Sequence, residues 1–292
     1  MKVAVYGLKA NESQKEFFDS FFSELHHRNI EILVEKDFLF LLKPIVSSDL
    51  KSVELFSSYE DLPAETDLLF TFGGDGTILE AATVIRDKMI PVVGVNTGRL
   101  GFLATINVEL LLESLGDILS GNYNISRRSL IEVETNGEQI ADNFALNEIT
   151  VTRRETTSMI TVRAKMNGEF LNSFWADGLI ISTPTGSTGY SLSCGGPIVH
   201  PDNNTFIITP IAPHNLNVRP FIIADDSLID LTIESRVGEY FLSLDSRNKP
   251  LSTLVELKIK KANFSMLIVE PKDKSYLMTL RDKLLWGSDK RN

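Results

Sequence analysis

The sequence has 292 residues, with 29 Lys and Arg against 39 Asp and Glu, which gives a formal net charge of −10. A chain this acidic is not expected to bind nucleic acid generally or to lie on a membrane surface, so local groups must hold any anionic ligand. The single cysteine, Cys194, excludes an internal disulfide, offers no metal cluster and favours a reducing compartment. The chain opens on a strand-like run that leaves no room for a signal peptide, and no apolar run approaches the roughly 18 residues of a membrane span. We therefore expect a cytoplasmic protein.

The first third of the chain alternates between expected strands and expected helices. A short apolar run at 2–6 is closed by Gly7. Ser13 and Glu16 predict a capping box at the start of the first helix, whose apolar stripe begins at Phe17. Further strands are expected at 30–35, 66–72 and 89–98, and helices at 11–29 and 78–87. This alternation indicates a parallel sheet wrapped by helices, so residues 1–126 are expected to form an α/β domain.

From about Arg127 the pattern changes to short alternating runs separated by turns. The dipeptide Asn136-Gly137 joins two such runs and predicts a β-hairpin. The runs continue to about residue 268, which predicts a mostly antiparallel, sandwich-like or barrel-like β domain over 127–268. Helical spacing returns in the last segment, 269–292. Because a lone helix needs an apolar surface to cover, we expect this segment to pack back on the first domain.

The motif Gly-Gly-Asp-Gly-Thr at 73–77 lies where a buried strand hands over to a helix. Its three glycines permit positive φ and close approach of a ligand, and the helix N-terminus suits phosphate. The motif lacks the Walker lysine and the Gly-x-Gly-x-x-Gly spacing. Asp75-Gly76 could be a simple turn. Alternatively, the Asp75 carboxylate could accept the proton of an attacking hydroxyl while glycine N–H groups hold phosphate, which favours phosphoryl transfer to an alcohol.

A second polar stretch at 183–196 is rich in hydroxyl groups and glycine. Tyr190 offers a flat face for a base, and the stretch lacks the spacing of a serine-centred hydrolase elbow. The alternative for this stretch is a Ser/Gly loop without function. The alternative for Asn147-Glu148 is a polar pair on an edge strand. The hydroxyl groups expected to serve as donors belong to Thr183, Thr185, Ser187, Thr188, Ser191 and Ser193.

The stretches "GGDGT", "NTGRLGFL" (96–103), "NE" (147–148) and "TPTGSTGYSLSCGGPI" (183–198) occur in the order seen in the NAD kinase family, and the chain resembles that family over nearly its whole length. The resemblance implies that ATP phosphorylates the 2′-hydroxyl of the adenosine ribose of NAD with the help of a divalent metal ion. We expect this ion to be Mg²⁺. The resemblance also implies an α/β domain, a sandwich-like domain, a final segment on the first domain, and a homodimer or homotetramer. The GGDG core alone also resembles diacylglycerol-type lipid kinases and phosphofructokinases.

Carried over by position, the resemblance implies Asp75 as the general base. No residue is assigned to metal. His214 and Arg219 match a family stretch near the site, although a Pro-flanked turn explains them equally well. The residues implied to bind NAD are Asp75, Gly76, Asn147, Glu148, Asp177, Thr188, Gly189, Tyr190, Ser191, Leu192, Ser193, Ala212 and Arg247, and those implied in the ATP-phosphate loop are Gly73, Gly74, Gly76 and Thr77.

Three departures from the family pattern bear on these roles. Gly189 stands where alanine is usual, Ser246-Arg247 replaces Gly-Gln, and Trp175 replaces an arginine of many bacterial relatives. The alternatives to an NAD kinase are another GGDG-type kinase acting on a lipid or polyol, and a non-catalytic NAD(P)-binding regulatory protein. The lack of a basic, membrane-facing stretch argues against the lipid or polyol kinase. The presence of Asp75 argues against the non-catalytic regulatory protein.

Overall fold

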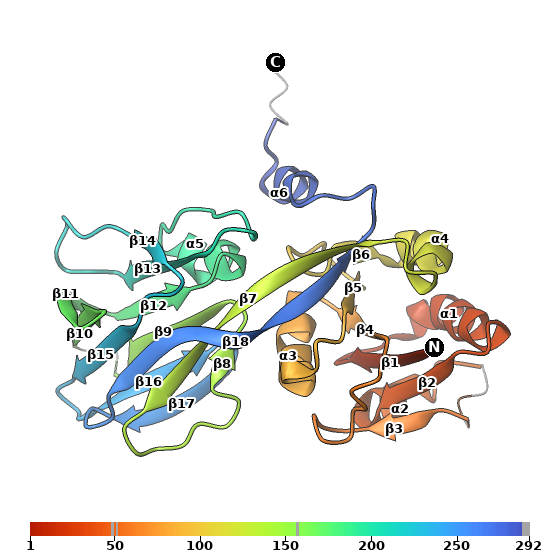
Figure 1. The fold of residues 1–292 in the computed structure, drawn as a ribbon, viewed down its shortest axis with the longest axis horizontal. Coiled ribbons are helices and arrows are strands. Elements are labelled where there is room, and N and C mark those ends of the chain that lie inside the picture. Colours follow the sequence, from red (N-terminus) through yellow and green to blue (C-terminus); the bar gives the residue numbers. More distant parts are fainter. Residues whose placement is uncertain (48–49, 51, 156–157, 288–292) are drawn as a thin grey trace. The chain divides into compact units, whose positions relative to one another are not determined.

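The computed structural model describes residues 1–47, 50, 52–155 and 158–287, which form two compact units (Figure 1). The first unit contains residues 1–127 and 266–292, and the second contains 128–265. The chain passes between them within two long strands, β7 (Asn124–Thr135) and β18 (Leu257–Glu270). None of the helices in the described ranges has the length and apolar character needed to cross a membrane.

The first unit is built on a parallel sheet, which confirms the expected α/β class. Its strands lie in the order β18-β5-β4-β1-β2-β3, and β6 pairs with β5. β1 pairs on one side with β2 and on the other with β4, so the chain has built outward in two directions from β1. The strands are β1 (Lys2–Gly7), β2 (Glu31–Glu35), β3 (Glu54–Phe56), β4 (Leu68–Gly73), β5 (Val92–Asn96) and β6 (Ile106–Asn107).

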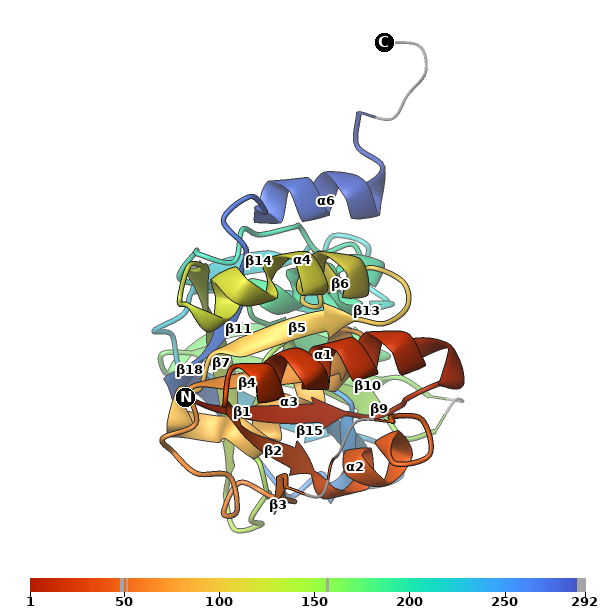
Figure 2. The same ribbon diagram turned by 90° about the vertical axis from the view of Figure 1, so that its right-hand side faces the viewer.

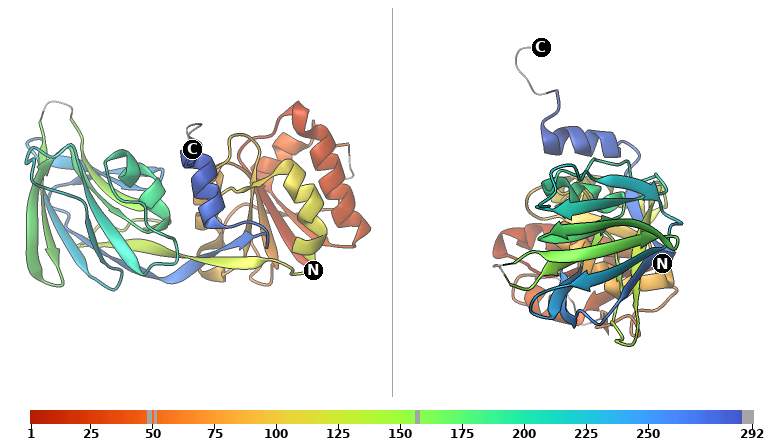
Figure 3. Two further views of the ribbon diagram at one scale, coloured as in Figure 1. Left: turned by 90° about the horizontal axis from the view of Figure 1, so that it is seen from above. Right: turned by 90° about the vertical axis from the view of Figure 1, so that its left-hand side faces the viewer.

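Helices cover both faces of this sheet. α1 and α4 lie on one side of the strands (Figures 2 and 3), and their apolar residues share a core with α2. α3 packs on the opposite face, where a Cβ placed on Gly94 of β5 would lie 2.6 Å from Ile78 Cδ1. The helices of this unit are α1 (Lys15–His27), α2 (Lys36–Leu42), α3 (Asp75–Ile85), α4 (Val108–Leu119) and α6 (Tyr276–Leu284), with 3-10 turns η1 (Glu12–Gln14) and η2 (Arg86–Lys88).

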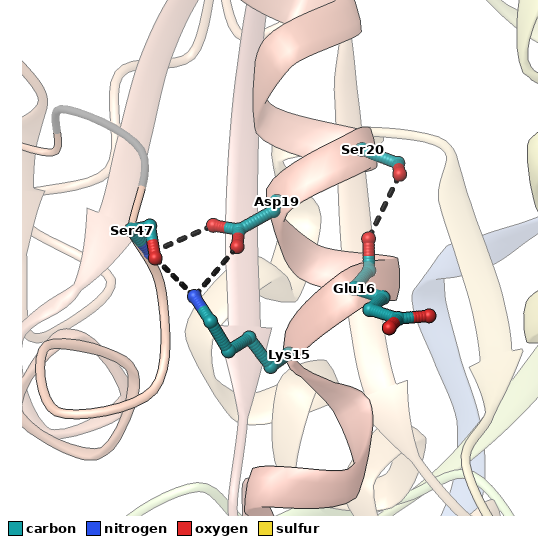
Figure 4. A network of polar contacts seen from close by, with 5 residues as sticks. All are labelled: Lys15, Glu16, Asp19, Ser20 and Ser47. Atoms are coloured by element: carbon teal, nitrogen blue, oxygen red, sulfur yellow. Dashed lines mark hydrogen bonds and ion pairs between the residues drawn. The ribbon is translucent and has the colours of Figure 1, made fainter.

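The start of α1 differs from the expected Ser13–Glu16 capping box. Gln14 Oε1 instead accepts a hydrogen bond from the Asn11 N–H at 2.9 Å, because a 3-10 turn precedes the helix. Within α1, Lys15 pairs with Asp19, and both contact Ser47 after α2 (Figure 4). The first turns of α1 are thus fixed to the segment that follows α2.

The second unit is antiparallel and consists of two layers, which confirms the expected β-rich class. One layer has the strand order β14-β13-β12-β9-β16-β17, and the other has the order β11-β10-β15-β18, with β7 pairing with β8 and β18. Apolar residues from both layers, such as Val151 and Val162, share one core. The remaining strands are β8 (Phe144–Ala145), β9 (Glu148–Arg153), β10 (Ile160–Met166), β11 (Glu169–Ala176), β12 (Gly178–Ser182), β13 (Thr205–Ile211), β14 (Phe221–Ala224), β15 (Ile229–Glu234), β16 (Glu239–Leu244) and β17 (Arg247–Ser252).

The hairpin expected at Asn136-Gly137 is longer than a two-residue turn. β7 pairs with β8 through Ile131 and Ala145, which leaves residues 136–143 as the connection. Asn136 is used elsewhere, because its Oδ1 accepts the Glu256 N–H at 2.8 Å. Asn136 thus bonds across the fold, while the Gly137 N–H donates to the Thr135 carbonyl at 3.0 Å within a longer loop.

Candidate functional site

The Gly-Gly-Asp-Gly-Thr motif follows β4 at the point where the sheet changes its direction of growth. β1, β2 and β3 run outward to one edge, whereas β4 and β5 run to the other. The carboxyl ends of strands at such a switch point are where open α/β sheets bind ligands. Asp75 therefore stands at the expected ligand-binding edge of the first unit.

The helix after the motif begins earlier than expected. Gly74 is the N-cap and Asp75 is the first residue of α3, so Thr77 lies within the first turn. The glycines are not used for positive φ, since Gly74 has φ −113°. At position 73 a side chain would clash, because a Cβ there would lie 2.0 Å from Thr77 Oγ1. At Gly74 and Gly76 the backbone is open, since nothing lies within 4 Å of either Cβ position.

The carboxylate of Asp75 is held by three consecutive backbone N–H groups of the loop after β5. Oδ2 accepts from Phe102 at 2.8 Å, and Oδ1 accepts from Leu103 and Ala104 at 2.9 Å each. A Cβ on Gly101 would lie 1.8 Å from Oδ1, so this contact requires glycine. A carboxylate has about four acceptor positions. One position on Oδ2 therefore remains for a further hydrogen bond.

The loop that holds Asp75 is itself fixed from several directions. The Thr97 N–H donates to the Gly73 carbonyl at 3.1 Å. The Asn96 side chain donates to the Arg99 carbonyl at 2.6 Å. From α6, Lys283 Nζ donates to the Leu100 carbonyl at 2.6 Å and lies 5.4 Å from the centre of the Phe102 ring. The last helix of the chain thus contacts the loop that positions Asp75.

The second unit contains a carboxylate with the same type of surroundings. Asp245, between β16 and β17, accepts from the N–H groups of Leu146, Asn147 and Glu148 at 2.8, 2.8 and 3.1 Å. No role for Asp245 was predicted from the sequence. Its position after an alternating run is typical of a turn, and nothing in the sequence connects it to residues about a hundred positions earlier.

The carbonyl groups of the same three residues are also satisfied. Thr183 accounts for two of them, since its hydroxyl donates to Leu146 at 2.6 Å and its N–H to Asn147 at 2.9 Å. The Asp245 N–H donates to the Glu148 carbonyl at 3.0 Å. Asp245 and Thr183 therefore form hydrogen bonds with all the backbone N–H and carbonyl groups of residues 146–148.

The side chains of Asn147 and Glu148 are less satisfied than their backbone. Asn147 Oδ1 and Glu148 Oε2 are buried and have no hydrogen-bond partner among the described residues. The pKa of Glu148 is raised to about 7, mainly by burial and also by the negative charge of Asp245, against the opposing effect of the hydrogen bond from the Tyr190 N–H. Burial also raises the pKa of Asp245, and its three amide donors oppose that change.

The stretch after β12 divides into internal and exposed residues. The Ser187 hydroxyl bonds with Val199, and that of Ser191 with Thr209 at 2.8 Å. These hydroxyls are buried, like that of Thr183, contrary to the expectation that the whole series faces a ligand. Thr188 donates to the Thr185 carbonyl at 3.2 Å. The exposed or half-buried residues of the stretch are Thr188, Gly189, Tyr190, Leu192, Ser193, Cys194 and Gly195.

The remaining residues implied in NAD binding have varied surroundings. Asp177 forms an ion pair with Arg153 at 3.0 Å. Arg247 donates to the carbonyls of Asp142 and Phe144 and lies over the Phe144 ring, so its guanidinium is used within the fold. Ala212 is exposed, with φ 43°.

The other positions with an implied or altered role are Trp175 in β11 and two residues in the exposed segment after β13, His214 and Arg219. The Trp175 and His214 rings lie 4.2 Å apart. Arg219 donates to the carbonyls of Leu216 and Val218, as expected for a structural turn.

A resident metal site is not formed by these side chains. The described residues contain no group of three or more His, Cys, Asp or Glu that could hold an ion. Asp75 has three of its acceptor positions occupied by amides.

Comparison with known proteins identifies both halves of the chain. Residues 14–123 match the family model described as the ATP-NAD kinase N-terminal domain, and residues 146–270 match the ATP-NAD kinase C-terminal domain. The chain is 48% identical to an NAD kinase of Christiangramia forsetii over 295 residues, with all of both chains covered. It is 38% identical to an NAD kinase of Bacteroides fragilis over 292 residues, again with both covered in full.

Two solved structures resemble the chain over almost all of its length. One is yeast NADH kinase complexed with NADH, with a TM-score of 0.88 and 25% identity, covering 99% of this chain and 88% of that one. The other is an NAD kinase from Archaeoglobus fulgidus in complex with ATP, with a TM-score of 0.74 and 25% identity, covering 98% and 99%.

Proposed function

The chain belongs to the NAD kinase family, and from that premise we propose that it transfers the γ-phosphoryl group of ATP to the 2′-hydroxyl of the adenosine ribose of NAD. The 2′-oxygen forms the new bond to phosphorus, the bond to the β-phosphate oxygen breaks, and NADP and ADP are the products. The observation that carries this proposal is the Asp75 carboxylate, fixed at a ligand-binding sheet edge with one acceptor position left on Oδ2.

Asp75 is the general base in this proposal. Its remaining acceptor position receives the hydrogen bond of the 2′-hydroxyl, and the proton moves to the carboxylate as the oxygen attacks phosphorus. The three amide donors keep the carboxylate in one orientation, so little reorganisation is needed at the moment of reaction. Gly76, with open space at its Cβ position, allows the ribose to approach.

The first turn of α3 is the element suited to hold the transferring phosphoryl group. The leading N–H groups of a helix have no acceptor within the helix and carry a partial positive charge. Gly74 has no atoms within 4 Å of its Cβ position, so a phosphate can approach the backbone there. Gly73 and Thr77 shape the turn through their mutual contact.

The dinucleotide contacts are proposed for the second unit. Asn147 and Glu148 present buried polar atoms without partners, which a ligand with hydroxyl and amide groups would satisfy. Tyr190 is exposed and offers a ring face for a base. Asp177 and Ser193 keep the binding roles that the resemblance implies, whereas the internal hydrogen bonds of Arg247 leave it a structural role.

The yeast NADH kinase and the Archaeoglobus NAD kinase are complexed with NADH and with ATP, which supports a dinucleotide acceptor and an ATP donor here. A Mg²⁺ requirement, a homodimer or homotetramer and a cytoplasmic location stay predictions. The lipid-kinase, polyol-kinase and sensor alternatives have no observation in their favour.

The test is product formation by the purified chain with NAD, ATP and Mg²⁺, with NADP detected by a dehydrogenase specific for it. Parallel reactions replace NAD with NADH, diacylglycerol or glycerol, and replace ATP with polyphosphate. With ATP as the donor, we expect NADP from NAD and NADPH from NADH, and no phosphorylated lipid or polyol. Phosphorylation of the lipid or polyol without NADP would overturn the proposal, and dinucleotide binding without any product would support the sensor.

A further inference from the structure

The backbone of residues 146–148 has an unusual arrangement of hydrogen bonds. Its three N–H groups all donate to one carboxylate, that of Asp245, and two of its three carbonyls accept from Thr183. Asp245 also donates its own N–H to the third carbonyl. Because two residues fix six polar groups, this segment has little freedom to rotate.

The conformation of Asp245 fits this task. Its φ is 52°, in the left-handed region where aspartate and asparagine are among the better tolerated residues other than glycine. The carboxylate turns back from this position onto the three amides. Burial of this carboxylate disfavours its charged form and raises its pKa, and the three amide donors oppose that change.

Resting on the proposed function, we propose that Asp245 is the positioning residue of the dinucleotide site, holding 146–148 so that the side chains of Asn147 and Glu148 face NAD. The atoms left without partners are on these two side chains, at Asn147 Oδ1 and Glu148 Oε2. Rotation of the segment would turn both away together. Asp245 thus acts through its neighbours and touches no substrate itself.

The electrostatic surroundings supply a readout of this arrangement. The charged or titratable groups around Glu148 are Asp245, which Arg247 faces in turn, and Cys194 and Tyr190 in the stretch after β12. The negative charge of Asp245 raises the pKa of Glu148 beyond the effect of burial. Ionised Glu148 accepts hydrogen bonds from NAD hydroxyls, so the KM for NAD should fall as the pH rises through about 7.

The experiment compares two variants with a matched control. Asp245→Asn keeps the size and tolerates the φ, but its Nδ2 cannot accept an amide. Asp245→Gly removes the side chain without backbone strain. Asp225→Asn is the control: it removes another buried carboxylate of the same unit, whose partner is Lys261 at 2.5 Å. Each protein is measured for kcat and KM for NAD between pH 5.5 and 8.5, for NAD affinity by calorimetry, and for melting temperature.

We expect Asp245→Asn to raise the KM about 10-fold and Asp245→Gly about 30-fold, since amides lose their acceptor and the segment loosens, with kcat changed less than about threefold. The inflection of KM with pH should move to lower pH by about half a unit or more in both variants, because the charge beside Glu148 is gone. Asp225→Asn should lower the melting temperature but change neither the KM for NAD nor the pH at which KM inflects.

An unchanged KM and an unchanged inflection in folded Asp245→Asn would overturn the positioning role. If the wild type makes no NADP, the proposed function fails separately, and calorimetry decides the inference: weaker NAD binding by the Asp245 variants still supports it. No binding of NAD by the wild type would overturn both. If Asp245→Gly does not fold, Asp245→Asn alone decides.

Discussion

Asp75 in the first unit and Asp245 in the second each accept hydrogen bonds from three consecutive backbone N–H groups, at distances between 2.8 and 3.1 Å. Their neighbours differ. Asp75 begins an 11-residue helix beside glycines with open space, whereas Asp245 lies in a turn between two strands beside a second carboxyl group, Glu148. Open space allows a reacting group to approach Asp75. Beside Asp245, Glu148 Oε2 has no hydrogen-bond partner among the described residues, so the role we propose for Asp245 is to position other side chains.

The comparison teaches that a hydrogen-bonding pattern does not by itself define a role. Three amides fix a carboxylate equally well at a helix start and in a β-turn. What separates chemistry from positioning is the access to the remaining acceptor position and the identity of the group next to it. Substitutions at the two sites should therefore separate into effects on kcat at Asp75 and effects on KM at Asp245.

The largest effect is expected for Asp75→Asn. A general base contributes about 10²- to 10⁴-fold to the rate, so kcat should fall by that factor, measured as NADP formed at saturating NAD and ATP. The asparagine Nδ2 also cannot accept from Phe102, so the melting temperature should fall by several degrees. Activity equal to the wild type in a folded Asp75→Asn protein would exclude Asp75 as the base.

The next effect tests the loop that holds Asp75. Gly101→Ala places a methyl group where Asp75 Oδ1 now lies, 1.8 Å away, so the loop or the carboxylate must move. We expect kcat to fall about 10-fold and the free energy of unfolding by about 1–3 kcal/mol. Gly98→Ala is the matched control in the same loop, because nothing lies within 4 Å of its Cβ position. Equal kinetics for the two variants would show that the orientation of Asp75 does not matter.

A smaller effect is expected from pH at the second site. Glu148 has a pKa of about 7 in the folded protein against an ordinary 4.5, so the folded state binds its proton more tightly than the unfolded state. This contribution to stability is complete below pH 4.5 and is lost as the pH rises to about 7. In Glu148→Gln it is absent, so the melting temperature of the variant relative to the wild type should rise over this range. A constant difference would contradict the raised pKa.

The smallest effect is expected at the contact between α6 and the loop. Lys283→Met removes the hydrogen bond to the Leu100 carbonyl but keeps a chain of similar length. Because exposed polar contacts contribute about 0.2–1 kcal/mol, the melting temperature should fall slightly and kcat should stay within about twofold. A tenfold loss of kcat would show that α6 controls Asp75 far more strongly than this contact suggests.

Much of the fold could be predicted from periodicity alone. The strand and helix alternation before residue 127 and the short strands after it indicated the parallel and antiparallel parts. α4 was not predicted, although Leu111, Leu115 and Ile118 have the spacing of one face of a helix. α2 has only seven residues, mostly apolar, and such a run does not distinguish a helix from a buried strand.

The candidate site could be predicted only in part. The GGDGT motif and its carboxylate were visible as a local pattern. The amide donors to Asp75 are 27 to 29 residues away, and those to Asp245 are 97 to 99 away, so tertiary folding alone brings them together. The hydroxyls of Ser187 and Ser191 were expected to face a ligand because sequence does not show which members of a polar stretch are buried.

The most direct test of the role of Asp75 is the dissociation constant of NAD for Asp75→Asn, measured by calorimetry on the same preparation used for NADP formation. We predict that Asp75→Asn loses turnover but binds NAD with an affinity within about tenfold of the wild type, because a general base acts mainly in the transition state. A loss of NAD affinity that accounts for the whole loss of activity would contradict it, since Asp75 would then be a binding residue and the reaction would need another base.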